Sequence, residues 1–182
     1  MIDLRNDDER GSDRAPRPAS VATLQLPLDA SEDREFWNVW GSGPQFGTPL
    51  YYRPHLDRYP ERSAAVVAAI ARAEPGGVLF HCGGGRDRAG QVAMLVLALA
   101  GVTAQEIAAD YELSAERLPA RYAARGEQDQ GPVLAGFLRE RGTTAGQLIV
   151  ETLAGLDIEA RLLGAGLTRA DVSRLRRRLL DP

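Results

Sequence analysis

The strongest constraint on the fold of this chain comes from residues 78–90, VLFHCGGGRDRAG. The short apolar run from Val78 to His81 follows a glycine pair, which is the pattern of a buried central strand. Three consecutive glycines then form a tight turn. An almost wholly apolar helix is expected from about Ala89 to Ala100, closed by Gly101. A strand, a turn and a buried helix in this order predict an α/β domain.

Further strands are expected before this segment. Met1 to Leu4 and the loosely alternating Val21 to Leu28 have strand character, whereas Asn6 to Ser20 is charged and rich in proline and is expected to be a loop. Pro60 is placed to open a helix that runs to about Ala73.

Only helices are expected after the glycine turn. Thr103 with Glu106, Thr144 with Gln147, and Thr168 with Asp171 have the spacing of capping boxes or close variants. The predicted fold is therefore an α/β domain, with a small central sheet flanked by helices and a helical C-terminal half.

The segment between the second strand and the Pro60 helix is less regular. Ser31 to Trp40 is expected to be a short helix or a lid, and residues 41–49 a Gly- and Pro-rich connection. Its aromatic residues, Trp37, Trp40, Tyr51 and Tyr52, would then lie where they could cover a site. His55 is expected to be a surface or lid residue.

Composition limits the other possibilities. The 182 residues correspond to one domain, 1–182, and the net charge of −3 argues against a general nucleic-acid binder. The longest apolar run, residues 92–102, is far shorter than the ~20 residues that cross a bilayer. The charged N-terminus of the chain is unlike a signal peptide, and the single cysteine of the chain cannot form an internal disulfide. We therefore expect a cytoplasmic protein without stable membrane insertion.

The glycine turn has the features of an anion site. Five residues separate Cys82 from Arg88. Gly83, Gly84 and Gly85 allow the backbone to curl so that its N–H groups point inward, and the following helix adds the positive end of its dipole. The guanidinium of Arg88 matches two phosphate oxygens. These features predict a phosphate-binding loop.

The same positive surroundings favour the thiolate form of a cysteine. Cys82 is therefore expected to attack phosphorus and form a phosphocysteine that water later hydrolyses. Because the loop amides and Arg88 would neutralise the charge on the phosphate oxygens, no metal or other cofactor is expected.

The loop resembles a known one. HCGGGRDRAG is similar to the H-C-x-x-G-K-D-R-T-G loop of the atypical bacterial tyrosine phosphatases, and the likeness extends to IDLR (2–5), Gly101-Val102, DYELS (110–114) and the closing LRRRLLDP. The resemblance implies that the α/β domain is cysteine-phosphatase-like. It also implies a phosphatase that acts on phosphotyrosine, sometimes phosphoserine or phosphothreonine, and phosphoinositides.

The resemblance also assigns roles. Cys82 matches the nucleophile and Arg88 the phosphate-binding arginine. Arg86, which is also expected to bind the phosphate, stands where the family has lysine. Asp87 matches the loop aspartate and is the first candidate for the general acid. The arginines on either side are expected to lower the pKa of Asp87, which works against that role. Asp29, at the end of the second strand, is the reserve candidate.

The chain departs from the family pattern in two places. Ala89 replaces a threonine whose hydroxyl helps the thiolate leave, and this change favours the alternative of a protein that binds phosphate without efficient release. Relatives also carry a further segment ahead of IDLR. Either the true start lies upstream, or this is a shortened version with an incomplete sheet.

Other interpretations remain open. A pseudophosphatase would bind phosphorylated ligands without turnover, and a lone cysteine after an apolar strand can simply be a small core residue. A nucleotide loop needs a lysine, which this sequence lacks, while a rhodanese loop is one residue shorter and arsenate reduction normally needs a second cysteine. His81 is expected to shape the loop. Asp3 and Arg5 either brace it from beneath or form an ordinary ion pair.

Overall fold

The computed structural model describes residues 1–12 and 16–181. Its elements, in chain order and with η for 3₁₀ helices, are β1 (Ile2–Asp3), η1 (Asp7–Ser12), β2 (Leu24–Gln25), α1 (Arg34–Trp40), η2 (Pro44–Gly47), η3 (Pro49–Tyr51), α2 (Tyr52–Arg58), α3 (Pro60–Arg72), β3 (Phe80–His81), α4 (Asp87–Leu99), α5 (Ala104–Arg125), α6 (Gly131–Glu140), α7 (Ala145–Leu153), α8 (Ile158–Gly164) and α9 (Arg169–Leu180). The predicted α/β class, with a small sheet and a helical second half, is confirmed.

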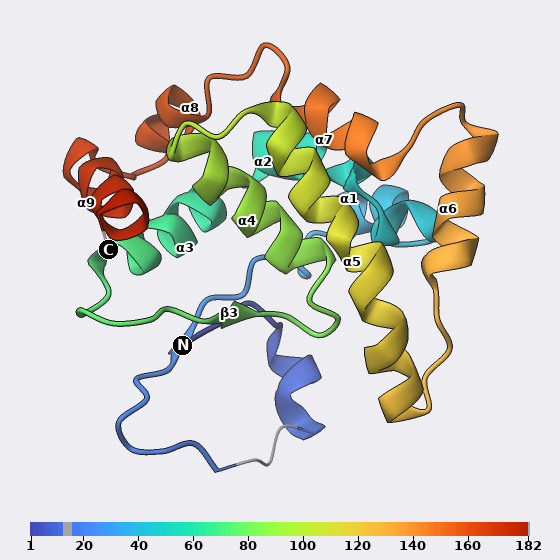
Figure 1. Cartoon of the computed structure of the whole chain (residues 1–182), viewed down its shortest axis with the longest axis horizontal. Coiled ribbons are helices and arrows are strands. Elements are labelled where there is room, and N and C mark those ends of the chain that lie inside the picture. Colours follow the sequence, from blue (N-terminus) through green and yellow to red (C-terminus); the bar gives the residue numbers. More distant parts are fainter. Residues whose placement is uncertain (13–15, 182) are drawn as a thin grey trace.

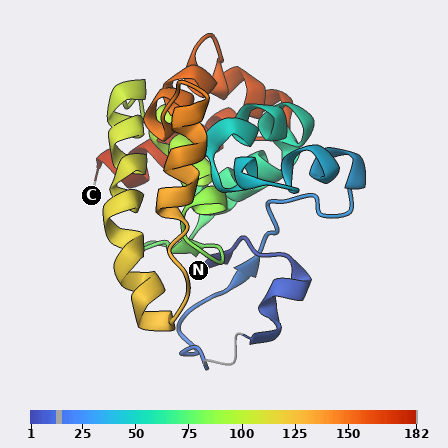
Figure 2. The ribbon, with the colours of Figure 1, turned by 90° about the vertical axis from the view of Figure 1, so that its right-hand side faces the viewer.

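The sheet is parallel and has the strand order β2-β1-β3. Ile2 pairs with Leu24 on one side and with Phe80 on the other. Figures 1 and 2 show the helices gathered on one side of the strands, with η1 on the other. The carboxyl ends of all three strands therefore meet at one edge, where the first residues of α4 also lie.

The prediction that Val78 to His81 forms a central strand is wrong, because β1 holds the middle position among the described strands. Val78 and Phe80 are half-buried and pack against the core, whereas the side chain of Leu79 between them is 60% exposed. Side chains alternate between the two faces of a strand. An apolar run alone does not distinguish a strand with one covered face from one buried on both.

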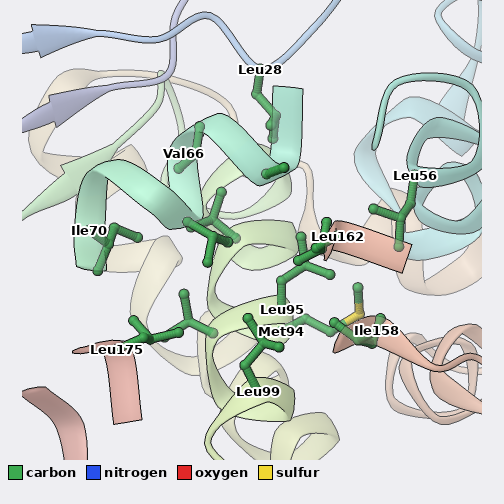
Figure 3. Packing of buried hydrophobic residues seen from close by; sticks show 14 of the residues in the cluster. Leu28, Leu56, Val66, Ile70, Met94, Leu95, Leu99, Ile158, Leu162 and Leu175 are labelled. Atoms are coloured by element: carbon green, nitrogen blue, oxygen red, sulfur yellow. The ribbon is translucent and has the colours of Figure 1, made fainter. Parts of the chain in front are cut away.

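The core lies between α4 and the helices around it. Met94, Leu95 and Leu99 contact apolar side chains of α3, α8 and α9, including Val66, Leu162 and Leu175 (Figure 3). Full burial of one such side chain contributes roughly 1.5–3 kcal/mol. This packing fixes α4, and with it the position of the glycine turn at its start.

The predicted helix signals are largely confirmed. Pro60 stands at the first turn of α3, and reciprocal capping boxes open α5 at Thr103 and α9 at Thr168. Thr144 caps α7 in one direction only, through the amide N–H of Gln147. No residue of α4 is exposed, as expected for its apolar sequence.

Two segments expected to be irregular contain 3₁₀ turns. In the Gly- and Pro-rich connection, η2 lies within residues 41–49 and η3 begins at their end. In the predicted loop from Asn6 to Ser20, the structure has η1, and residues 13–15 of this loop lie outside the described part. The backbone N–H of Asn6 donates to Glu9 Oε2 at 2.9 Å, and that of Glu9 donates to the Asn6 carbonyl. This local pairing closes the first turn of η1. No helix in the described residues is long and apolar enough to cross a bilayer.

His55 is not a surface residue, contrary to the prediction. Its side chain is fully buried, and its Nδ1 lies 3.0 Å from Nε2 of Gln91 on α4. Burial lowers the pKa of His55 to about 4. In the sequence, His55 follows an irregular segment. In the fold, it lies on the side of α2 that faces the core.

We therefore expect His55 to destabilise the protein in mild acid. The unfolded chain takes up a proton near pH 6.5 and the folded chain only near pH 4, so His55 lowers the free energy of unfolding between these values by up to about 3 kcal/mol. Urea unfolding of native and His55→Asn protein from pH 7 to 4 measures this. The effect of His55 is the difference between the pH profiles of the two proteins. The native profile alone is not enough, because Asp29, whose pKa is raised, makes the free energy of unfolding change with pH in the opposite direction. Parallel pH profiles would contradict the prediction.

Candidate active site

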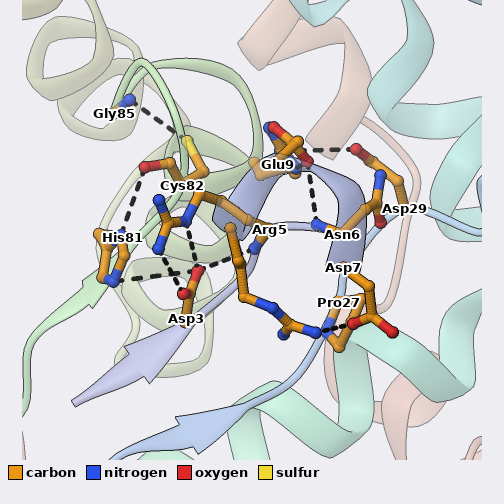
Figure 4. Close-up of polar contacts among 12 residues, drawn as sticks. Asp3, Arg5, Asn6, Asp7, Glu9, Pro27, Asp29, His81, Cys82 and Gly85 are labelled. Atoms are coloured by element: carbon orange, nitrogen blue, oxygen red, sulfur yellow. Dashed lines mark hydrogen bonds and ion pairs between the residues drawn. The ribbon is translucent and has the colours of Figure 1, made fainter. Parts of the chain in front are cut away.

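The glycine turn connects the carboxyl end of β3 to α4. Cys82 follows His81 directly, and α4 begins at Asp87 with Arg86 as its N-cap, two residues before the expected start. Gly85 has φ of +83°, a conformation that strongly favours glycine. Its N–H donates to Cys82 Sγ at 3.2 Å (Figure 4). The sulfur is thus held inside the turn, with the side chain of Cys82 8% exposed.

Arg88 is brought to the same place by the first turn of α4. Its Nη1 and Nη2 both pair with the carboxylate of Glu9, the Nη2–Oε1 distance being 2.6 Å. Its Nε faces Asp29 Oδ2 at 3.5 Å. Arg88 is buried, so these two carboxylates supply the negative charge that a buried guanidinium requires.

Glu9 was not identified from the sequence. Hydrogen bonds from Arg88 are the main cause that lowers its pKa, so it is an ionised partner of the arginine. Its Oε1 also lies close to Gly83, since a Cβ on that glycine would be 3.6 Å away. The only local signal is the pairing of Asn6 with Glu9 across the first turn of η1, and nothing in it indicates a partner 79 residues away.

Asp29, the reserve candidate for general acid, lies at the same edge of the sheet, 5% exposed. Burial raises the pKa of Asp29 to about 6, against the opposing effect of Arg88. Its Oδ1 is buried without a hydrogen-bond partner among the described residues. Asp29 is therefore a carboxyl group that holds its proton more readily than usual and stands beside Arg88.

Asp87 behaves differently from the prediction made for it. Burial is the largest influence and raises the pKa of Asp87, although Arg86 and Arg88 both act to lower it. The expectation of a lowered pKa is therefore wrong. Its Oδ1 lies 3.4 Å from Nε of Arg86. A raised pKa suits a group that must be protonated when it donates to a leaving oxygen.

Residues from other elements hold the loop from outside. The hydroxyl of Tyr52 donates to the carbonyl of Asp87 at 2.7 Å, and Arg121 on α5 donates to the carbonyl of Gly83 at 2.9 Å. Tyr111 packs against Gly90 so closely that a Cβ there would lie 2.7 Å from its ring. Tyr51 and Tyr52 are fully buried. They therefore belong to the frame of the site and not to a cover over it.

Asp3, Arg5 and His81 form a polar group beneath the loop (Figure 4). Arg5 donates to Asp3 through Nε at 2.9 Å and Nη2 at 2.7 Å. Burial alone would raise the pKa of Asp3, but these bonds lower it to about 2. His81 lies 3.9 Å from Asp3 and 3.3 Å from the carbonyl of Cys82. The ion pair between Asp3 and Arg5 is present, whereas His81 Nε2 makes no hydrogen bond to Asp3 or to any other described residue. That this group braces the loop stays a prediction.

The residues named from the sequence, Cys82, Gly83, Gly84, Gly85, Arg86, Asp87 and Arg88, thus lie together in one turn at the carboxyl edge of the sheet. Of the glycine amides, that of Gly85 is directed at the sulfur. An inward direction of the others remains a prediction. The structure adds Glu9 and Arg121, which come from η1 and α5.

The chain is similar to known phosphatases. A family model described as the tyrosine phosphatase family matches residues 1–181. A tyrosine-protein phosphatase of Nostoc commune is 34% identical over 119 residues, a match that covers 64% of this chain but only 40% of that protein. The triple specificity protein phosphatase PtpB of Mycobacterium tuberculosis is 31% identical over an alignment that covers 99% of this chain and 81% of PtpB.

Proposed function

This chain belongs to the tyrosine phosphatase family, and from the geometry of its Cys82 loop we propose that it hydrolyses phosphomonoesters through a phosphocysteine. Phosphotyrosine on a protein is the proposed substrate, with phosphoinositides as a second class. The observation that carries the proposal is the hydrogen bond from Gly85 N–H to Cys82 Sγ in a turn that also presents Arg88. This bond holds the nucleophilic sulfur inside the turn, close to the arginine that would bind the phosphate.

The reaction has two steps. In the first, Cys82 Sγ attacks phosphorus, the bond from phosphorus to the leaving oxygen breaks, and Asp87 donates a proton to that oxygen. In the second, water attacks phosphorus, the sulfur–phosphorus bond breaks, and Asp87 takes up the proton of the water. The loop amides and Arg88 bind the three remaining phosphate oxygens throughout.

The pairing of Arg88 leaves one side of its guanidinium for the substrate. Glu9 takes Nη1 and Nη2, whereas Nε is 3.5 Å from Asp29, longer than the ~2.7–2.9 Å of a good charge-assisted hydrogen bond. A phosphate oxygen can replace this weak contact. Glu9 then holds the arginine in place while its Nε side binds phosphate.

We expect steady hydrolysis of p-nitrophenyl phosphate without added metal, continuing well beyond one equivalent of product. The rival is a pseudophosphatase, and it is favoured by Ala89, whose methyl group offers no hydroxyl to the departing sulfur. A rapid-quench time course separates the two, because the rival would stop at one equivalent. In that case Ala89→Thr should restore turnover, and failure to do so would remove Ala89 as the cause.

Substrates with poor and good leaving groups test which carboxyl group, that of Asp87 or that of Asp29, is the general acid. Asp87→Asn is expected to lower kcat for phenyl phosphate by about 10²–10⁴-fold, and that for p-nitrophenyl phosphate far less, since a good leaving group needs no proton. Asp29→Asn is the matched comparison, because it removes a second buried carboxyl beside Arg88. If Asp29→Asn shows the loss that depends on leaving group and Asp87→Asn does not, Asp29 is the acid.

A further inference from the structure

Two grooves lie beside the turn that would hold phosphate, and they meet at one residue of that turn, Arg86. The first groove, between η2 and α6, has a volume of about 430 Å³ and is lined by Arg86 and Asp87, with the exposed side chains of Phe46 and Val133 at its walls. The second groove, between α5, α6 and the η2–η3 turn, has a volume of about 410 Å³. Its lining is mainly apolar and includes Pro49, Tyr111, Ala115, Leu118, Ala135 and Leu138.

The grooves are neighbours and share part of their walls. Gly47, Arg86, Asp129 and Leu134 line both. At Gly47 the space is narrow, since a Cβ there would lie 2.8 Å from a methyl of Leu134 and 3.2 Å from Nη2 of Arg86. The absence of a side chain at this one position therefore keeps the two grooves in contact.

We propose that the two grooves bind the alkyl chain of a lipid-like phosphomonoester, a further substrate class for the same catalytic loop. The inference rests on the proposed function, because Asp87 can serve the leaving oxygen only if that oxygen lies next to it. Whatever is attached to the oxygen then enters the first groove, which Asp87 lines. A long chain continues past Gly47 into the second groove.

The lining favours an alkyl chain over a peptide. A peptide backbone carries an N–H and a C=O at nearly every residue, and these are costly to bury without partners. Polar side chains also line the second groove, but most of the surface that it exposes is apolar, including a wall formed by Leu118, Leu134 and Leu138. The polar lining residues are Thr48, Arg86, Glu112, Ser114, Asp129, Arg139, Thr143 and Thr144. An uncharged chain of methylenes meets this surface without that cost.

The test measures binding of butyl, hexyl, octyl and decyl phosphate below their micelle concentrations to the full-length Cys82→Ser protein. Each methylene that becomes buried should tighten binding by about fourfold, until the second groove is full. A flat series would overturn the proposal. Phosphotyrosine peptides with and without apolar flanks are measured on the same protein. A gain in affinity from the apolar flanks, with none from longer alkyl chains, would also overturn the proposal.

Two variants locate the effect. Gly47→Val should close the passage, and Ala135→Trp should fill the second groove from α6. Each is expected to lower the ratio of decyl to butyl phosphate affinity by at least about tenfold. Gly77→Val is the matched control, because a Cβ there meets nothing within 4 Å. An unchanged ratio in both groove variants would show that the chain binds elsewhere and would also overturn the proposal.

This outcome is independent of turnover. If the native chain fails to hydrolyse p-nitrophenyl phosphate, the proposed function is lost, yet the chain-length series in Cys82→Ser still decides whether the grooves bind alkyl phosphates. If turnover is present and the series is flat, the proposed function stands and the alkyl site does not.

Discussion

Cys82→Ser protein is expected to lose steady hydrolysis of aryl phosphates by at least about 10⁴-fold, because it lacks the nucleophile on which both steps depend. A serine hydroxyl is a much weaker nucleophile than a cysteine sulfur at neutral pH, and its oxygen would take the place of the sulfur that the Gly85 N–H contacts. The substitution changes little in size, and the turn should remain folded. Initial rates with p-nitrophenyl phosphate, without added metal, give the measurement.

The single cysteine of the chain provides an independent control. Alkylation by iodoacetate can modify a thiol only at Cys82, so incorporation of one equivalent with parallel loss of activity identifies the nucleophile in unmutated protein. Inorganic phosphate should slow the alkylation. Activity that survives in Cys82→Ser, or in fully alkylated protein, would exclude the phosphocysteine mechanism.

The sequence predicted those parts of the site that are local along the chain. Cys82, the glycines and Arg88 lie within seven consecutive residues, so their spacing alone defines a turn that ends in a helix. Capping boxes and the proline that opens α3 are local in the same sense, and they were also predicted. A pattern within one turn or one helix is set by its own residues.

The contacts that the sequence did not predict join distant elements. Glu9 and Arg121 reach the turn from η1 and α5, and no periodicity of their own segments indicates the partner. The direction of the pKa shift of Asp87 was wrong for a related reason. The sequence displays its charged neighbours, Arg86 and Arg88, but not the burial that outweighs them. The burial of His55 was missed in the same way.

Arg88→Lys is expected to lower kcat/KM for aryl phosphates by about 10²–10⁴-fold, with much of the loss in phosphate binding. A guanidinium can hold Glu9 through Nη1 and Nη2 and still offer Nε to phosphate, whereas an ammonium is one point charge. Lysine is preferred to alanine here because Arg88→Ala would leave Glu9 and Asp29 near the turn without this cation, and the loss of stability would obscure the result. Steady-state rates and the inhibition constant of inorganic phosphate measure the effect.

Arg86→Lys is the matched control, since it makes the same change two residues earlier in the same turn. The side chain of Arg86 is 11% exposed, nearly as buried as that of Arg88, but its contacts with Asp87 and Gln130 are 3.4 Å and 3.5 Å long, so no close bidentate pair would be lost. Its kcat/KM should stay within about tenfold of native protein. A larger loss for Arg86→Lys than for Arg88→Lys would assign phosphate binding to Arg86. It would leave the pairing of Arg88 with Glu9 as a structural contact that stabilises the turn.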